Sequence, residues 1–274
     1  MAGRSAQNGH AEHPSQKAVA APRLGRSCSA GRDRAIFLTT RRWASVNLGG
    51  RPPLYFGYSE LNPPALKLRI TSLTRSSLVN ATFAIDDLVH QEKVRYVGCS
   101  NFLTYQLVRA IGRSETLRLA RFDSVQPRYN LLFRQIEREM LPFCGEEGVG
   151  VIPYNPIAGG LLSGKHSRTA PPPEGTRFTL GSAAEAYQDR YWHDREFDTV
   201  EVLRQLAQKA GVSLVTLSVA WILANKAITA PIIGASRPEQ LDSSLASAEF
   251  TLDDDLKYKL DECTHQYRMG DAPR

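Results

Sequence analysis

The sequence predicts an α/β fold built on parallel strands, and three observations support this. Short apolar runs recur through the last two thirds of the 274-residue chain. Segments with helical periodicity separate these runs, and small or polar residues follow each run directly. Short buried strands that alternate with helices are typical of βα units, whose strands lie parallel to one another. The sequence therefore favours a parallel sheet with helices packed against it.

The expected elements follow one another from Thr82 onward. Apolar residues four positions apart, such as Ala84 and Leu88, indicate an amphipathic first helix. Gly211 is expected to end one helix before the next begins, and Pro238 to open the last helix at its first turn. The expected helices are 82–91, 104–111, 136–147, 198–210, 213–225 and 238–246, and the expected strands are 94–97, 124–126, 150–153 and 228–233.

The N-terminal part differs from the rest of the chain in composition and charge. Residues 1–80 hold ten Arg and two Lys against three acidic residues, a balance of +9, whereas the remaining 194 residues balance at −3. Only 34–40 has the apolar character of a strand there, and two proline pairs interrupt the residues after it. We therefore expect an irregular, basic segment over 1–81, either disordered, a transit peptide or aberrant in sequence, and a folded domain over 82–274.

Composition and charge argue against several classes of protein. The four cysteines show no metal-ligand spacing, so neither a metal site nor a disulfide framework is expected. The apolar runs fall short of the roughly 20 residues that span a bilayer, so no membrane partner is expected. The net charge of +6 comes from the N-terminal segment, which has no aromatic interleaving, and this argues against nucleic-acid binding. We expect a cytoplasmic location, or an organellar one if the basic arm is a transit peptide.

Polar residues follow the expected strands at the position where parallel βα folds bind their ligands. Side-chain amides can pair with a carboxamide, a tyrosine offers a flat face to an aromatic ring, and Ser with Arg before a helix suits a phosphate. Each residue alone is more often an ordinary turn, core or surface residue, but their shared order suits a nucleotide with an amide head. The residues are Ser100, Asn101, Gln126, Tyr154, Asn155 and 234–237.

Four segments resemble, in the correct order and at suitable intervals, the fifth to eighth strands of the aldo-keto reductases. The segments are VRYVGCSNF (94–102), FDSVQPRYNLL (122–132), GVIPYNPIAGGLLSGK (150–165) and ITAPIIGASRPEQLDSSL (228–245). The family consists of NADP(H)-dependent oxidoreductases built on a (β/α)8 TIM barrel. The resemblance covers about 82–262, so we expect an incomplete, truncated barrel in which strands five to eight are clear. A partial barrel leaves strand edges unpaired, so an oligomer is possible.

The resemblance implies roles for the residues after the first three of these strands. Ser100, Asn101 and Gln126 would bind the nicotinamide carboxamide, and Tyr154 would stack on the nicotinamide ring. A second group would lie along the pyrophosphate. That group consists of Asn155, Ile157, Gly159 and Leu161.

The resemblance also implies a site for the adenosine end of the cofactor. Gly234, Ser236 and Arg237 would hold the 2′-phosphate, with Gln240 nearby, which favours NADP(H) over NAD(H). Ser244 stands where the family usually has an asparagine that contacts adenine. We therefore expect weaker contact with adenine but retained binding.

The catalytic residues of the family are not recognisable in this chain. The resemblance implies catalysis by a tyrosine assisted by a lysine, an aspartate and a histidine, all on the first four strands. No Asp-Thr-Ala-x-x-Tyr-Gly motif occurs, and 31–41, which resembles the third strand, has Arg41 in place of the lysine. The resemblance nevertheless implies NADPH-dependent reduction of a small aldehyde or ketone. The alternative is a catalytically inactive NADP(H)-binding or regulatory member.

Overall fold

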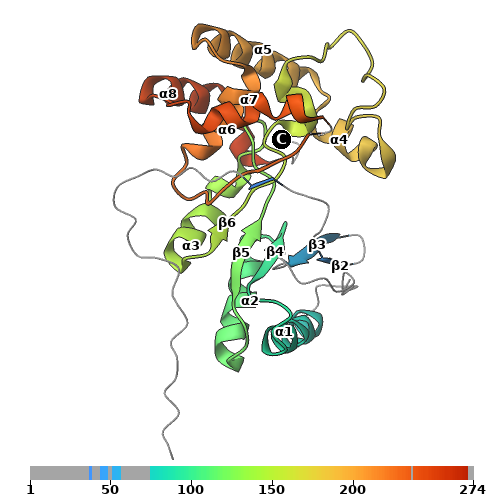
Figure 1. Cartoon of the computed structure of the whole chain (residues 1–274), viewed down its shortest axis with the longest axis vertical. Helices are drawn as coiled ribbons and strands as arrows, with labels where there is room; N and C mark the ends of the chain where they lie inside the picture. The colour runs from blue at the N-terminus through green and yellow to red at the C-terminus, as the bar shows by residue number, and fades with distance from the viewer. Residues whose placement is uncertain (1–36, 39–43, 49–50, 57–74, 236, 271–274) are drawn as a thin grey trace, which may run out of the picture. The chain divides into compact units, whose positions relative to one another are not determined.

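The computed structural model describes residues 37–38, 44–48, 51–56, 75–235 and 237–270 (Figure 1). The chain divides into two units, Met1–Asp33 and Arg34–Arg274. All the described residues belong to the second unit. Arg41 and Ser236, which were singled out from the sequence, are not among the described residues.

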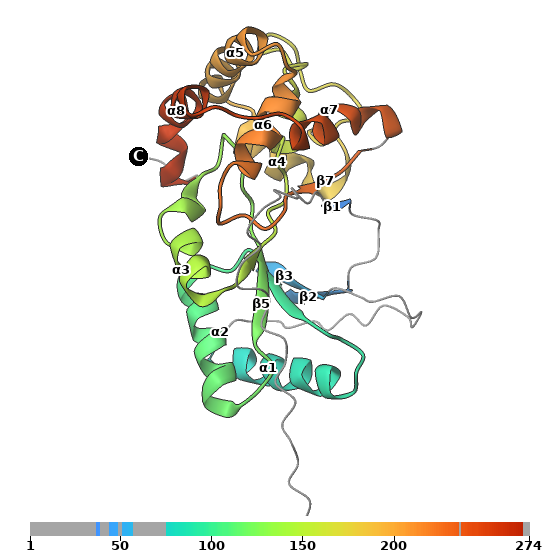
Figure 2. The ribbon, with the colours of Figure 1, turned by 60° about the vertical axis from the view of Figure 1, so that its left-hand side comes forward.

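Four strands form the centre of the described fold; Figure 1 shows β4, β5 and β6, and Figure 2 shows β7. The first three pair in the order β4, β5, β6. The fourth strand continues this arrangement, because the Thr229 amide donates to Val151 O at 2.9 Å and the Ile232 amide donates to Pro153 O at 2.8 Å. The carboxyl ends of all four strands therefore meet at one edge. The strands are β4 (Val97–Ser100), β5 (Phe122–Gln126), β6 (Gly150–Val151) and β7 (Ile232–Ile233).

Three further strands flank this group. β2 (Ala44–Leu48) and β3 (Arg51–Phe56) form an antiparallel hairpin, and β3 pairs antiparallel with β4. β1 (Phe37–Leu38) pairs parallel with β7, on the opposite side of the sheet from β4. Of the strand expected at 34–40, the structure describes Phe37–Leu38, which lie beside the last strand. The resemblance of 31–41 to the third strand of the family stays a prediction.

One face of the sheet carries a row of small residues. Gly98 on β4 pairs with Ser124 on β5, which in turn pairs with Gly150 on β6. A Cβ atom on Gly98 would lie 2.4 Å from Ser124 Oγ, so these two strands approach too closely for a larger residue there. Because strand residues alternate between faces, the row lies on the same face as Ser100 and Gln126.

The predicted helices are found in the predicted order with shifted ends, and the structure adds two that were not expected, α4 and α8. Gly211 has φ of 71° between α5 and α6, as expected of a helix stop. The helix expected at 238–246 is instead split into η4 (Pro238–Gln240), α7 (Asp242–Leu245) and η5 (Ala246–Ala248). The main helices are α1 (Arg75–His90), α2 (Thr104–Leu117), α3 (Met140–Glu147), α4 (Ala184–Tyr191), α5 (Asp194–Lys209), α6 (Leu214–Leu223) and α8 (Asp254–Cys263).

The strand expected at 94–97 begins three residues later, at Val97. Val94 is buried, but its amide and that of Lys93 donate to Leu88 O at the end of α1. The start of the run 94–97 therefore belongs to the end of α1 and only its last residue to the strand. Hydrophobic periodicity in the sequence does not show this boundary. No single helix of the described part is long and apolar enough to cross a membrane. Among the described helices, only α5 and α6 taken together have the length and apolar composition of a membrane span, and they are bent by 91° relative to each other.

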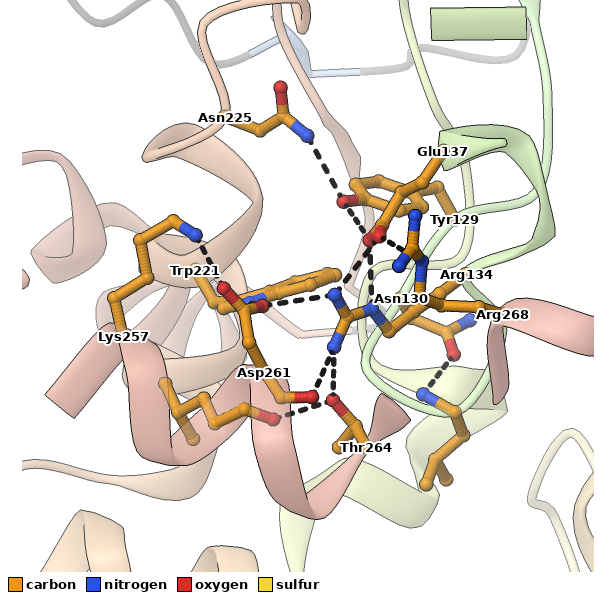
Figure 3. Close-up of polar contacts among 12 residues, drawn as sticks. Tyr129, Asn130, Arg134, Glu137, Trp221, Asn225, Lys257, Asp261, Thr264 and Arg268 are labelled. Carbon is orange, nitrogen blue, oxygen red and sulfur yellow. Dashed lines mark hydrogen bonds and ion pairs between the residues drawn. The ribbon is translucent and has the colours of Figure 1, made fainter. Parts of the chain in front are cut away.

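Arg134 connects the segment after β5 to the C-terminal helices (Figure 3). Its Nε and Nη2 donate to the two oxygens of Glu137 at 2.8 and 2.9 Å. Its Nη1 donates to Asp261 O at 2.9 Å and to Thr264 Oγ1 at 2.7 Å. Burial alone would lower the pKa of Arg134, but Glu137 and Asp261 raise it above its ordinary value. The guanidinium is only 6% exposed, so its partners rather than water stabilise its charge.

We predict that Arg134→Met lowers the free energy of unfolding by about 3 kcal/mol, because it removes the buried cation that Glu137 and Asp261 share and leaves them with the partly exposed Arg268 and Lys257. Urea denaturation measures this loss. Arg204→Met is the control, since Arg204 pairs with Glu201 while 58% exposed, and it should cost less than about 1 kcal/mol. Equal losses in the two variants would contradict the role given to Arg134.

Candidate functional site

The carboxyl edge of the sheet joins four predicted cofactor residues into one chain of hydrogen bonds. Ser100 Oγ donates to Gln126 O at 2.9 Å and accepts from Asn101 Nδ2 at 3.1 Å. Tyr154 OH donates to Asn101 Oδ1 at 3.0 Å. Asn101 has φ of 54°, a left-handed conformation that asparagine tolerates better than most residues. Residues from three parallel strands are therefore held together at this edge.

The polar groups at this edge differ in how far they are already engaged. The Ser100 hydroxyl is buried and has both a donor and an acceptor partner, so it orients its neighbours. The half-buried side-chain amide of Gln126 forms no hydrogen bond with any residue that the structure describes. It can therefore donate to and accept from a ligand carboxamide at the same time.

Tyr154 is held in its neutral form. Burial raises the pKa of Tyr154, and the nearby cations Arg190 and Arg128 reduce that rise only in part. Its hydroxyl proton is directed at Asn101. Tyr154 therefore offers a ring face to a ligand but is not an acid activated by a lowered pKa.

The segment after β6 forms a tight loop organised by Asn155. Asn155 Oδ1 accepts from the Gly159 amide at 2.6 Å, and its Nδ2 donates to Tyr191 OH at 3.0 Å. Asn130 Nδ2 donates to Asn155 O at 3.0 Å and to Tyr191 OH at 3.1 Å. The sequence did not indicate Asn130 and Tyr191 as site residues, because Tyr191 lies on α4 in a region without a clear pattern.

The loop follows a backbone path that glycine favours. Asn155, Ala158, Gly159 and Gly160 all have positive φ values. A Cβ atom on Gly159 would lie 2.6 Å from Tyr187 Cδ1. Both the backbone conformation and the space around it therefore favour glycine at position 159.

Two further residues predicted along the pyrophosphate contribute through their main chain. Leu161 is 1% exposed and belongs to the hydrophobic core, and Ile157 is half-buried against that core. Their side chains therefore fix the loop from beneath, so that only main-chain groups can face a ligand.

The residues predicted for the adenosine end follow β7, beside the segment that leads to Tyr154. Gly234, Arg237 and Gln240 are exposed, and no described residue forms an ion pair with Arg237. Only the three-residue η4 follows Arg237, so the guanidinium rather than a long helix would attract a phosphate. Ser244 is 6% exposed on α7, so the structure does not bring it to the same exposed surface.

His166 is a half-buried residue near the loop, with both ring nitrogens buried, that the sequence did not single out. Its ring makes edge contacts with Phe178 and Trp192 at centroid distances of 5.2 and 5.4 Å. Burial lowers the pKa of His166, and the adjacent Lys165 lowers it further, which favours the neutral form. No group of three or more His, Cys, Asp or Glu that could hold a metal occurs in the described ranges.

Comparison with known proteins identifies the family. The profile of the Aldo/keto reductase family matches residues 62–265, and the chain belongs to this family. A Schizosaccharomyces pombe protein named as an aryl-alcohol dehydrogenase is 36% identical over 177 residues, which are 64% of this chain and 48% of that protein. An aldo-keto reductase of Alternaria alternata is 33% identical over 180 residues, 65% of this chain and 46% of that one.

Comparison with solved structures agrees on the fold. The glycerol dehydrogenase of Gluconobacter oxydans superimposes with a TM-score of 0.57 and 23% identity, over 72% of this chain and 56% of that chain. The predicted family and its TIM-barrel fold are therefore confirmed. The chain spans about half the length of the curated relatives it matches. The boundary predicted between 81 and 82 stays a prediction.

We predict that Gly159→Ala lowers the free energy of unfolding by about 1–3 kcal/mol more than Gly175→Ala, because only the first added methyl collides with Tyr187. Both glycines have positive φ, so the backbone strain is matched and the comparison isolates the collision. Thermal unfolding of the two variants measures the difference. Equal destabilisation would show that the close contact carries no cost.

Proposed function

We propose that the chain binds NADP(H) along the carboxyl edge of β4, β5, β6 and β7 and acts as an oxidoreductase on a small aldehyde or ketone. Family membership supports the general class of this activity. The observation that carries the cofactor proposal is the hydrogen-bonded group of Ser100, Asn101 and Tyr154 with the open amide of Gln126 beside it.

The chemistry of this edge fits each part of the cofactor. The Gln126 amide suits a carboxamide, and the half-buried Tyr154 ring suits a flat heterocycle. The Asn155–Gly159 loop can bring main-chain groups close to a pyrophosphate. Arg237, exposed after β7, suits the 2′-phosphate that distinguishes NADP(H) from NAD(H).

We predict that Arg237→Ala weakens NADPH binding at least about tenfold while changing NADH binding by less than about twofold, because a charge-assisted contact to the phosphate is lost. Titration of cofactor fluorescence measures both affinities. Arg109→Ala, which removes an exposed charge from α2, is the control and should leave both affinities unchanged. Equal loss of NADPH and NADH binding in Arg237→Ala would contradict phosphate recognition.

The bound cofactor would supply the hydride, and this chain's residues would orient it and exclude water around it. Tyr154 does not supply the proton, since its pKa is raised and its hydroxyl is directed at Asn101. In the family, the catalytic tyrosine, lysine, aspartate and histidine lie on the first four strands of the barrel, so none of them is expected among β4 to β7. A cytoplasmic location and any oligomer stay predictions from the sequence.

A second candidate is a catalytically inactive NADP(H)-binding or regulatory protein. It is motivated by the sequence, in which the tyrosine, lysine, aspartate and histidine of the family are not recognisable. We predict that the full chain oxidises NADPH in the presence of a panel of small aldehydes, followed by the loss of NADPH absorbance. NADPH binding by folded protein without any oxidation above buffer would reject turnover and support the second candidate.

A further inference from the structure

A cavity of about 380 Å³ lies beside Arg134, among residues not assigned to the cofactor (Figure 3). Its walls come from the segment after β5, the start of α3, the end of α6, and α8 with the turn that follows it. Glu137, Trp221, Lys257, Asp261 and Arg268 all border the space. Its volume lies within the range of about 300–1,000 Å³ that is usual for small-molecule pockets.

The two carboxylates of the cavity are already engaged by the protein. Glu137 Oε1 accepts from Tyr129 OH at 2.9 Å and from Arg134 Nε at 2.8 Å, and its Oε2 accepts from Arg134 Nη2 at 2.9 Å. Asp261 Oδ1 accepts from Trp221 Nε1 at 2.9 Å and lies 3.1 Å from Arg134 Nη2. The acidic groups therefore have little remaining capacity to accept hydrogen bonds from a ligand.

The basic groups of the cavity have unused donors instead. Lys257 Nζ donates to Asp261 Oδ2 at 2.5 Å, and no other described residue takes up its two remaining N–H groups. Arg268 Nε faces Glu137 Oε2 at 3.2 Å, and no described residue accepts a hydrogen bond from its Nη1 or Nη2 groups, although the side chain is 37% exposed. With Arg134, the lining holds three cations against two carboxylates, a surplus of one positive charge.

Part of the remaining wall of the cavity is apolar, and Tyr129 and Asn225, which are hydrogen-bonded to each other, add polar groups to it. Leu141 and Pro142 at the start of α3, together with the indole of Trp221, border the space. A ligand that fits would place a negative group near Lys257 and Arg268 and a compact apolar body against this wall.

We propose that this cavity binds a small organic carboxylate, recognised by Lys257 and Arg268 and packed against Leu141, Pro142 and Trp221. The unused donors favour a ligand with hydrogen-bond acceptors, and the positive charge surplus favours a negatively charged ligand. The apolar residues favour a ligand that also has a hydrophobic part. The site is separate from the proposed cofactor edge and does not depend on oxidoreductase activity.

Benzoate is the probe, with benzyl alcohol and benzylamine as neutral and cationic probes of similar size. Isothermal titration calorimetry of the full chain should give saturable binding of benzoate at millimolar concentration and none of the other two. Because this comparison uses the unaltered chain, it does not depend on any variant folding. Equal binding of benzoate and benzyl alcohol, or no binding of benzoate, would overturn the proposal.

Three variants test the location. Lys257→Met and Arg268→Met should each weaken benzoate binding about tenfold, since each removes a donor to a charged group. Lys259→Met, which removes the same charge from α8 where Lys259 pairs with Asp255 outside the cavity, should change binding less than about twofold. Circular dichroism establishes that each variant is folded. Unchanged benzoate binding in folded Lys257→Met and Arg268→Met would place the ligand elsewhere and overturn the proposal.

Discussion

The buried guanidinium of Arg134 connects the segment after β5 to the C-terminal helices of the described fold, while Glu137 balances its charge from within the same segment. Arg134 reaches Asp261 and Thr264 from the same guanidinium, and Asp261 in turn accepts from Trp221 on α6. Segments more than a hundred residues apart in sequence therefore share one buried cation. The hydrogen bond from Trp221 to Asp261 holds α6, and α6 leads into β7. The contacts of Arg134 therefore also help to position the residues after β7 beside β6.

The cofactor edge is organised differently, through neutral hydrogen bonds between amides and hydroxyls. Asn101 and Asn155 each adopt a positive φ and each use the side chain to hold a neighbouring segment. Such bonds fix side-chain orientation without burying charge, which leaves the surface open to an anionic ligand. Preorganised polar groups of this kind lower the cost of ordering a site when a ligand binds.

The order of β4 to β7 and of the helices between them could largely be predicted because short apolar runs and helical periodicity are local properties, but α4, α8 and the β2–β3 hairpin were not predicted. The shared position of Ser100, Asn101, Gln126 and Tyr154 at one edge could be predicted for the same reason, since each lies at or just after the end of a strand, whereas their role in cofactor binding stays a prediction. Tyr191 and Asn130 could not, because their importance comes from a contact between distant segments. The split of 238–246 into three short pieces was also hidden, since its apolar spacing resembles that of one continuous helix.

The row formed by Gly98, Ser124 and Gly150 has a consequence for how barrel halves can be combined. It lies one layer below Ser100 and Gln126 on the same face, and it contributes almost no side-chain volume. Barrel interiors are filled by layers of side chains from opposing strands, so bulk at this level has to come from across the barrel. A chimera that places strands with small inward residues opposite this row would have a void beneath Ser100 and Gln126. One with large residues there would complete the layer.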